Sequence, residues 1–479
     1  MRALLAYSLS LHFLVLLLLP NVVNAREFFL ATTGVDNLNC GDLLSPCRNV
    51  SYVLEPANKL VNDGDILTLL APPGQTIFDE LETRLRKRLT IRSAPGQRAH
   101  IRCPITVTDA VCMQFDPDSS GSRIERLEIS GGELYTLFFQ TDWEQDGNPS
   151  GTGASNIVVS DSLLHDSGRD VVKITPKCND IRIERSEIYR SGQIYPPGTP
   201  LDDKNAEGID NVNGARMIVR DSYIHDIATS GLYFKGGAQD VLIERNVIER
   251  VGLAGILVGF DTSPEFFDLG ENPGYFEAVR GIVRNNIVQD ADYAGIGLYA
   301  SKDAQVLNNT VQRVAKIGHA AIYFGVTLQD FEPQALRPAN SNPRILNNIV
   351  RTDGKDCVAI RYANELGGLS GLSGAPGMNF QGFQNSLGSC RFLDGRPGSS
   401  LNDGGTLAQW RSATSSDAQS IETIIALTAA GRIFAGSAAI NAGITLPEVT
   451  DDIDRQLRTG VPDLGADELS DQIYRHGFE

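Results

Sequence analysis

The chain has 479 residues, a formal net charge of −17, 47 glycines and only 7% aromatic residues. This acidic balance argues against nucleic acid as a partner, because nucleic-acid binding requires clustered lysine and arginine. The chain is longer than a usual single globular core, and its glycines are spread along it, which indicates one long repetitive core.

The first 25 residues, MRALLAYSLSLHFLVLLLLPNVVNA, contain one arginine, an apolar run and small residues before Arg26. This layout predicts a secretory signal peptide, 1–25, cleaved after Ala25. No later segment is long and apolar enough to span a bilayer. We therefore expect a secreted or periplasmic protein that has no membrane span and is a monomer.

Seven cysteines in an exported chain predict disulfides with one thiol left over. The spacings favour the pairs Cys40 with Cys47, Cys103 with Cys112, and Cys357 with Cys390. Cys178 is then the free thiol. Because the chain has no C-x-x-C motif, we expect neither a zinc site nor a redox role.

A repeat runs through the middle of the chain, anchored on a small polar residue that an apolar residue follows two places later. The anchors, spaced by 24, 36, 24, 40, 23 and 39 residues, are Ser162, Ser186, Ser222, Asn246, Asn286, Asn309 and Asn348. The columns three residues before and two residues after the anchor are apolar in all seven copies. The column three residues after the anchor is polar and is expected to face water: His165, Tyr189, His225, Glu249, Gln289, Gln312 and Arg351.

Columns that alternate with period two predict strands, and a fixed period of about 23 residues predicts that each copy stacks on the one before it. Three of the spacings correspond to one coil, and the other three to one coil plus a loop. Serine and asparagine at the anchor fit a tight turn whose side chains hydrogen-bond from one rung to the next.

With these columns the sequence resembles the right-handed parallel β-helix proteins, a group rich in secreted polysaccharide lyases and glycosidases. The resemblance implies an all-β fold with three strands per coil. It places an N-terminal cap and the first coils in residues 26–98, with a capping helix near Val50 to Leu60. The β-helix core with its groove loops is expected in 99–365, and a C-terminal loop and capping segment packed on the helix in 366–479.

The coils are expected from Asp65 to Ala363, with an irregular region around residues 116–155. The glycine- and serine-rich stretch GGLSGLSGAPGMNFQGFQ that follows is expected to be a loop. The C-terminal segment is expected to cover the open end of the coils, since an uncovered coil exposes strand edges.

The phrases GIDNVNG and GLYFKGG are expected in the first strand of their coils, where the outward residues form two columns. The first column is Lys173, Asp210, Tyr233, Leu257, Gly297 and Tyr323, and the second is Thr175, Val212, Lys235, Gly259, Tyr299 and Gly325. Stacking places Asp210 and Lys235 on neighbouring rungs, within plausible reach of each other. Glu207 leads into the same strand, and the loop QIYPPGTPLDDKNA brings Asp202 and Asp203 to the mouth of this face.

Lyases of this fold use a lysine or arginine as base beside acidic calcium ligands. The resemblance therefore implies Lys235 as the base that takes the C5 proton, with calcium supplying positive charge to the substrate carboxylate. The calcium ligands would be drawn from Glu207, Asp210, Asp202 and Asp203. Lys173 or Arg245 would assist by binding the substrate carboxylate. The chain has no four-aspartate cluster of the pectate-lyase type. The prediction is a lyase that cleaves a uronic-acid-containing polysaccharide by β-elimination.

Two alternatives stay open. One is a glycoside hydrolase that uses two carboxylates from Asp202, Asp203, Glu207 and Asp210. The other is a noncatalytic carbohydrate-binding or adhesion protein. Outward tyrosines either stack on sugar rings or pack against loops: Tyr233, Tyr299 and Tyr323. His319 either borders the groove or is structural, and His165 and His225 are interpreted as surface decoration.

Overall fold

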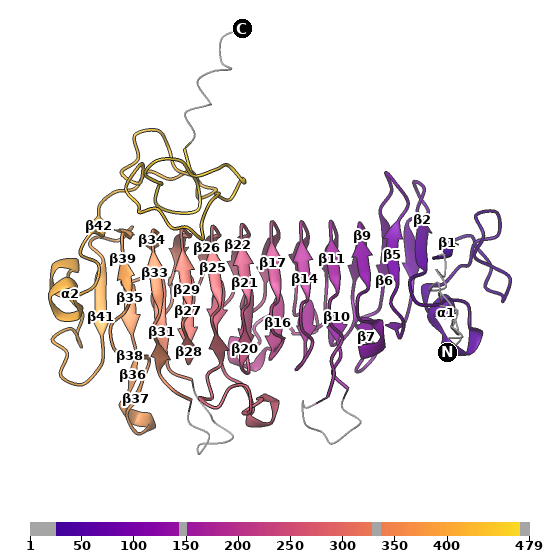
Figure 1. Ribbon diagram of the computed structural model, residues 1–479, viewed down its shortest axis with the longest axis horizontal. Coiled ribbons are helices and arrows are strands. Elements are labelled where there is room, and N and C mark those ends of the chain that lie inside the picture. Colours follow the sequence, from indigo (N-terminus) through magenta and orange to yellow (C-terminus); the bar gives the residue numbers. More distant parts are fainter. Residues whose placement is uncertain (1–24, 143–150, 328–336, 470–479) are drawn as a thin grey trace, which may run out of the picture.

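The computed structural model describes residues 25–142, 151–327 and 337–469, so the predicted signal peptide, apart from Ala25, lies outside the described residues. The chain winds into coils whose strands stack into three long parallel sheets running the length of the molecule (Figure 1). We name them sheets I, II and III, in the order in which a coil visits them.

Sheet I is formed by β4 (Thr83–Leu85), β7 (Val111–Phe115), β10 (Tyr135–Phe139), β13 (Val172–Ile174), β16 (Ile209–Val212), β19 (Leu232–Lys235), β23 (Ile256–Val258), β27 (Ile296–Tyr299), β31 (Ile322–Gly325), β35 (Asp356–Ile360) and β41 (Arg391–Asp394). Sheet II is formed by β1 (Glu27–Ala31), β2 (Ile66–Leu70), β5 (Thr90–Ser93), β8 (Arg123–Glu125), β11 (Val158–Ser160), β14 (Arg182–Glu184), β17 (Ile218–Arg220), β21 (Leu242–Glu244), β25 (Ile282–Arg284), β29 (Gln305–Leu307), β33 (Arg344–Leu346) and β39 (Met378–Asn379).

Sheet III is formed by β3 (Ile77–Asp79), β6 (Ala99–Arg102), β9 (Leu127–Ser130), β12 (Leu163–His165), β15 (Glu187–Tyr189), β18 (Tyr223–Ile227), β22 (Val247–Val251), β26 (Ile287–Ala291), β30 (Thr310–Val314), β34 (Ile349–Thr352), β40 (Gly382–Asn385) and β42 (Ile421–Glu422). A small parallel sheet contains β20 (Ala238–Gln239), β24 (Ala278–Val279), β28 (Ser301–Lys302), β32 (Asn340–Ser341) and β38 (Leu372–Ser373), while β36 (Tyr362–Ala363) and β37 (Leu369–Ser370) pair antiparallel.

The two apolar columns that the repeat predicted form the core of the β-helix. The column before the anchor lies in sheet II, and its members are fully buried: Val159, Ile183, Val219, Ile243, Val283, Val306 and Ile345. The column after the anchor lies in sheet III and is equally buried: Leu164, Ile188, Ile224, Ile248, Val288, Val311 and Val350. Their removal from water is the main force that holds neighbouring coils together.

The anchor residues form the predicted ladder at the corner between sheets II and III. The backbone N–H of Asn246 donates to the side-chain oxygen of Asn286 at 3.0 Å, and that of Asn286 donates to Asn309 at 3.0 Å. Each asparagine amide nitrogen also donates to the next asparagine and to a backbone carbonyl. The ladder therefore satisfies polar groups that the tight turn buries.

A second ladder runs along the outer edge of sheet III, where non-glycine residues adopt a positive φ. Asp166, Arg190, Asp226 and Arg250 have φ between 52° and 57° and alternate in charge from coil to coil. Each arginine binds the aspartate of the preceding coil, with Nε to Oδ1 distances of 2.5 Å for Arg190 and 2.8 Å for Arg250. These ion pairs partly offset the cost of the left-handed conformation, about 1 kcal/mol per residue.

Short helices close both ends of the β-helix. α1 (Val50–Leu54) buries three apolar residues, and it is shorter than the predicted helix because Pro56 disfavours helical geometry at the residue before it. α2 (Leu407–Thr414) begins with a capping box between Thr406 and Gln409, and its fully buried Trp410 packs on the last strand of sheet I. Single 3₁₀ turns occur at η1 (Pro56–Asn58), η2 (Pro117–Ser119), η3 (Leu201–Asp203), η4 (Pro264–Phe266) and η5 (Asn364–Leu366).

The coils extend further than the sequence predicted. The region around residues 116–155 contains the regular strands β8, β9 and β10, and the glycine-rich stretch after residue 366 contributes β38, β39 and β40. Glycine suits β40 because a Cβ at Gly382 would lie 2.3 Å from Cδ1 of Ile425. The glycine-rich composition therefore wrongly predicted a loop here, because glycine in this stretch allows close packing of a strand.

The last part of the predicted C-terminal segment packs on the β-helix along its side (Figure 1, yellow). Ile425, Ile433 and Leu464 form an apolar cluster with Ile349 of sheet III. Further along, the side chain of Asn347 donates to the carbonyl of Ile444 at 2.8 Å. The end of the core is closed, as predicted, by an earlier part of the same segment, the helix α2.

The three predicted disulfides are present, and Cys178 is a free, buried thiol. Within the part of the chain that the structure describes, we find no helix with the length and apolarity needed to cross a membrane.

Candidate functional site

The register of sheet I is the one that the sequence predicted. Lys173 pairs with Asp210 and Asp210 with Tyr233 in the first outer column, while Val212 pairs with Lys235 in the second. The columns therefore bring together residues from β13, β16 and β19, which lie far apart in the chain.

The outer face of sheet I is covered, which corrects the expectation of an open tyrosine-lined face. Of the twelve residues in the two outer columns, all are buried except Lys173 and Lys235. Tyr233, Tyr299 and Tyr323 are only 2%, 6% and 6% exposed. They form an apolar cluster of their own with small and aromatic neighbours, so these rings pack the molecule and are not free to stack on a sugar.

Lys173 is bound to Asp210 in an ion pair that is almost completely enclosed. Burial by itself would lower the pKa of Lys173, but the carboxylates of Asp210 and Asp170 outweigh it and raise that pKa. The amine therefore stays charged at neutral pH, and it lies 5.9 Å from the ring centre of Tyr135. A permanently charged, bound ammonium cannot accept a proton.

Asp170 and Glu207 lie beside this ion pair and are buried. The backbone N–H of Glu207 donates to Oδ1 of Asp170 at 2.9 Å, and the hydroxyl of Thr229 donates to Oε1 of Glu207 at 2.8 Å. Burial, together with the neighbouring Asp170 carboxyl, raises the pKa of Glu207 well above its usual value. Burial also raises the pKa of Asp170. A proton retained on this pair removes the repulsion between two adjacent buried carboxylates.

Sequence reasoning missed Asp170, although the repeat contained the signal. The pairing of Val172 with Ile209 places Asp170 directly opposite Glu207, two residues before the first inward position of each strand. Extending the columns two residues towards the N-terminus would have found this acidic pair.

Lys235 does not face Asp210 as predicted. Its ammonium lies over the ring of Tyr233, 4.4 Å from the centroid, and 5.6 Å from that of Phe260. It forms no ion pair with any residue that the structure describes. The register is the predicted one, with Tyr233 next to Asp210 and Lys235 two residues further on, but the long side chain of Lys235 turns onto the rings of Tyr233 and Phe260.

The structure does not bring the four predicted calcium ligands together. Asp202 and Asp203 are exposed in η3, whereas Glu207 and Asp210 are buried under the face of sheet I. Among the described residues, no group of carboxylates with the spacing of a metal site forms on sheet I.

Arg245 lies away from sheet I, which corrects its predicted role beside the lysines. It follows β21 at the corner between sheets II and III, where it binds Asp221, Glu244 and Asp451 of the C-terminal segment. It lines a cavity of about 690 Å³ between this corner and the tail. Because three carboxylates bind its guanidinium, Arg245 attaches the C-terminal segment to the β-helix.

The remaining predicted residues are placed as follows. His319 is exposed and stacks on Tyr323 with 4.2 Å between ring centres, so it borders the outer face of sheet I. His165 and His225 lie on sheet III, where they are only 4% and 8% exposed. The expectation that their column faces water is wrong for these two and for Gln289 and Gln312, which are 4% and 0% exposed. The histidine rings stack on Tyr189 between them.

Comparison with known proteins agrees with this architecture. A family model described as the right handed beta helix region matches residues 151–268. No curated protein sequence matches the chain. Among solved structures, pectate lyase Pel9A is 14% identical with a TM-score of 0.55, with 93% of this chain and 98% of that chain covered. XylC in complex with xylose is 10% identical with a TM-score of 0.50 and the same coverage.

The A-module of mannuronan C-5 epimerase AlgE6 from Azotobacter vinelandii is 14% identical with a TM-score of 0.47, covering 76% of this chain and 85% of that one. Identities this low show the fold and not the activity. The predicted fold class, a right-handed parallel β-helix, is confirmed.

Proposed function

We propose that the protein is a polysaccharide lyase that cleaves a uronic-acid-containing glycan by β-elimination, with Lys235 as the base. One observation carries the proposal: in the two outer columns of sheet I only Lys173 and Lys235 are not buried, and only Lys235 is without a carboxylate partner in the described chain. It is therefore the basic side chain of this face that can meet a substrate.

In the proposed reaction the neutral amine of Lys235 takes the proton from C5 of a uronate. The electrons of the C5–H bond form a double bond to C4, and the C4–O bond to the leaving sugar breaks with its electron pair. The leaving oxygen then takes a proton from water. The half-buried ring of Phe260, 5.6 Å from the Lys235 ammonium, offers an apolar surface against which a sugar ring can lie.

Lys173 has a different role in this proposal. Its charge is held in place by Asp210 and Asp170, so it stays protonated and is not the base. Calcium enters no step of the mechanism, because the four predicted ligands do not lie together. The assay below tests its contribution directly.

Two arguments support a uronate polymer as the substrate: the acidity of the proton to be removed, and the name of one protein that shares the fold. A lysine base suits a proton made acidic by an adjacent carboxylate, which uronates supply. Pel9A is named as a pectate lyase, and pectate is a uronate polymer.

The test is a screen of acidic and neutral polysaccharides with the mature protein, with and without calcium. Unsaturated ends are read by ultraviolet absorbance, and new reducing ends are read in parallel. Lys235→Met is expected to lower the rate by about 10²- to 10⁴-fold, the usual contribution of a general base. Lys302→Met is the matched control, because Lys302 also lies over an aromatic ring but in the small sheet, and it should change nothing.

Full activity of Lys235→Met would contradict the role of this lysine. The absence of unsaturated product from every uronate polymer, with and without calcium, would contradict lyase activity altogether. Binding of a glycan without any product would then identify a carbohydrate-binding protein.

A glycoside hydrolase is the second candidate, favoured by the acidic cluster of sheet I. Glu207 has a raised pKa and lies near Asp210, which is paired with Lys173. A protonated Glu207 would suit the general acid of hydrolysis, and Asp210 the base. Its burial is the argument against it, because Glu207 is only 5% exposed. Reducing ends without unsaturated product, abolished by Glu207→Gln and retained by Lys235→Met, would select the hydrolase.

A further inference from the structure

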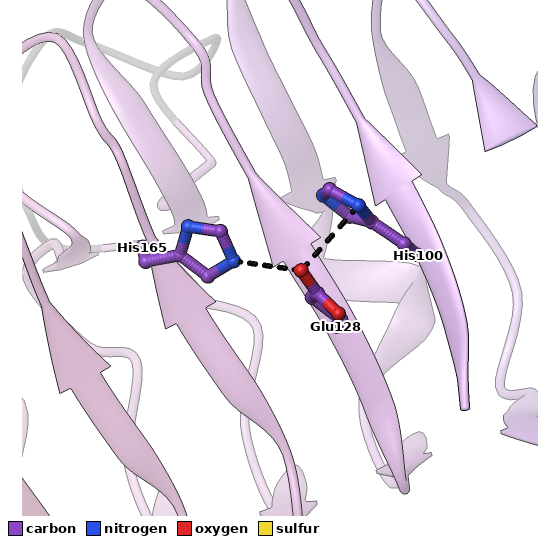
Figure 2. A group of neighbouring side chains, drawn as sticks. All are labelled: His100, Glu128 and His165. Atoms are coloured by element: carbon purple, nitrogen blue, oxygen red, sulfur yellow. Dashed lines mark hydrogen bonds and ion pairs between the residues drawn. The ribbon is translucent and has the colours of Figure 1, made fainter. Parts of the chain in front are cut away.

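Three consecutive coils place His100, Glu128 and His165 together on the outer face of sheet III, away from the proposed catalytic face (Figure 2). They come from β6, β9 and β12. In the register, His100 lies opposite Glu128, and His165 is two residues beyond the residue opposite Glu128 on the next strand. Both imidazole rings point at the same carboxylate oxygen.

The two contacts with Glu128 are close to the ligand-to-ligand distances of a zinc site. Nε2 of His165 lies 3.1 Å from Oε1 of Glu128, and Nδ1 of His100 lies 3.4 Å from the same oxygen. All the ligand atoms lie within 4.8 Å of one another. Zinc binds nitrogen and carboxylate oxygen at about 2.0–2.2 Å, so the edges of a zinc tetrahedron measure about 3.3–3.6 Å.

Neighbouring polar groups orient both rings towards Glu128. Nδ1 of His165 lies 2.8 Å from Oδ2 of Asp166, and Nε2 of His100 lies 2.7 Å from the hydroxyl of Ser130. A carboxylate on the far nitrogen of a histidine is the usual second contact of a metal ligand, because it fixes the tautomer that leaves the other nitrogen free to bind. Nη2 of Arg190 also lies 3.3 Å from Nδ1 of His165, so this nitrogen is held by groups on both sides while Nε2 is directed at Glu128.

His225 provides an internal comparison two coils further on. Its Nε2 lies 2.9 Å from Glu187 and its Nδ1 lies 2.6 Å from Asp226, which repeats the contacts of His165. The residue that pairs with Glu187 on the preceding rung, however, is Leu163 and not a histidine. The His225 group therefore has one imidazole directed at its carboxylate, whereas the His165 group has two.

We propose that His100, Glu128 and His165 bind a divalent transition-metal ion, with zinc as the first choice. Two imidazoles and one carboxylate are donors that suit zinc and its neighbours and do not suit calcium. The side chains of His100 and Glu128 are 14% and 28% exposed, so water can complete the coordination. The ion would join three successive coils near the N-terminal end of the β-helix.

The site escaped motif searching because its ligands come one from each coil. A search for cysteine motifs, or for histidines closely spaced in sequence, finds none of them. Only the stacking of coils makes residues about 28 and 37 positions apart into neighbours.

The test is isothermal titration of zinc chloride into the untagged mature protein after treatment with a chelator. One ion per chain is expected to bind. His100→Ala and His165→Ala should each weaken binding by more than about 100-fold, and Asp166→Asn by about 10- to 100-fold. His225→Ala is the matched control and should bind zinc like the parent protein. Circular dichroism verifies that each variant is folded.

Absence of zinc binding by the parent protein overturns the proposal. Binding that survives both His100→Ala and His165→Ala also overturns it and would point to another site, such as the carboxylates of Asp452, Asp454 and Asp467. An equal loss of zinc affinity in His225→Ala would overturn the proposal too, because it would show that the histidine substitutions act by disturbing the fold. Lyase activity is unaffected by His100→Ala on this view, so failure of the metal site and failure of the proposed catalysis are separate results.

Discussion

Replacing Lys173 by methionine is expected to destabilise the protein much more than the loss of a typical surface ion pair. The reason is Asp210, whose side chain is only 1% exposed and whose carboxylate is bound by Lys173. Without that ammonium, a buried charge remains beside Asp170 and Glu207, which are also acidic and buried. Methionine fills most of the volume of the lysine chain, so the effect reports on charge and not on a cavity.

The magnitude follows from the burial of the pair. Removing one partner of a buried ion pair costs about 3–5 kcal/mol, because the other charge is left without compensation. The exposed pair of Arg102 and Asp79 provides the scale for comparison, since its side chains are 51% and 68% exposed. Arg102→Met should cost less than about 1 kcal/mol.

Urea denaturation followed by circular dichroism measures the free energy of unfolding. The double variant Lys173→Met/Asp210→Asn should be more stable than Lys173→Met by about 2 kcal/mol or more, because the amide removes the buried charge and keeps the shape. The reasoning is refuted if Lys173→Met costs no more than Arg102→Met, or if the double variant is as unstable as the single one.

Two further predictions concern the stability of the C-terminal half. Replacing Cys357 and Cys390 by serine should lower the free energy of unfolding by about 3.8 kcal/mol, against about 2.5 kcal/mol for Cys40 and Cys47, because the disulfides close loops with sequence separations of 33 and 7 residues. Urea denaturation of the two double variants measures both losses. A larger loss for the Cys40 and Cys47 variant would contradict the entropic account. Burial raises the pKa of Asp417 to about 6, so between about pH 4 and pH 6 the folded state holds a proton that the unfolded state has lost. The free energy of unfolding should therefore fall as the pH rises through this range. Asp417→Asn should remove this part of the pH dependence in denaturation curves, and an unchanged profile would assign it to other groups.

Several site residues were predictable because the repeat determines which side chains share a column. The alignment of residues 172–175 with the strand of GIDNVNG placed Lys173 and Asp210 on adjacent rungs, and the structure has this register. What the alignment does not contain is the direction of a long side chain. Lys235 turns onto Tyr233 and Phe260 instead of Asp210, and that choice depends on rings from two different segments.

The sequence by itself determined the β-helix: apolar columns of period two within a period of about 23 residues can be buried only by stacking, and this also determined the serine and asparagine ladder. The tertiary structure alone decided which outward residues meet water. The tyrosines of sheet I are buried because they pack on one another and on small residues of neighbouring rungs. Arg245 binds the tail because the C-terminal segment, whose course no periodicity encodes, lies over its corner. It alone also brought His100 to His165, since contacts between coils depend on loop lengths that column positions do not reveal.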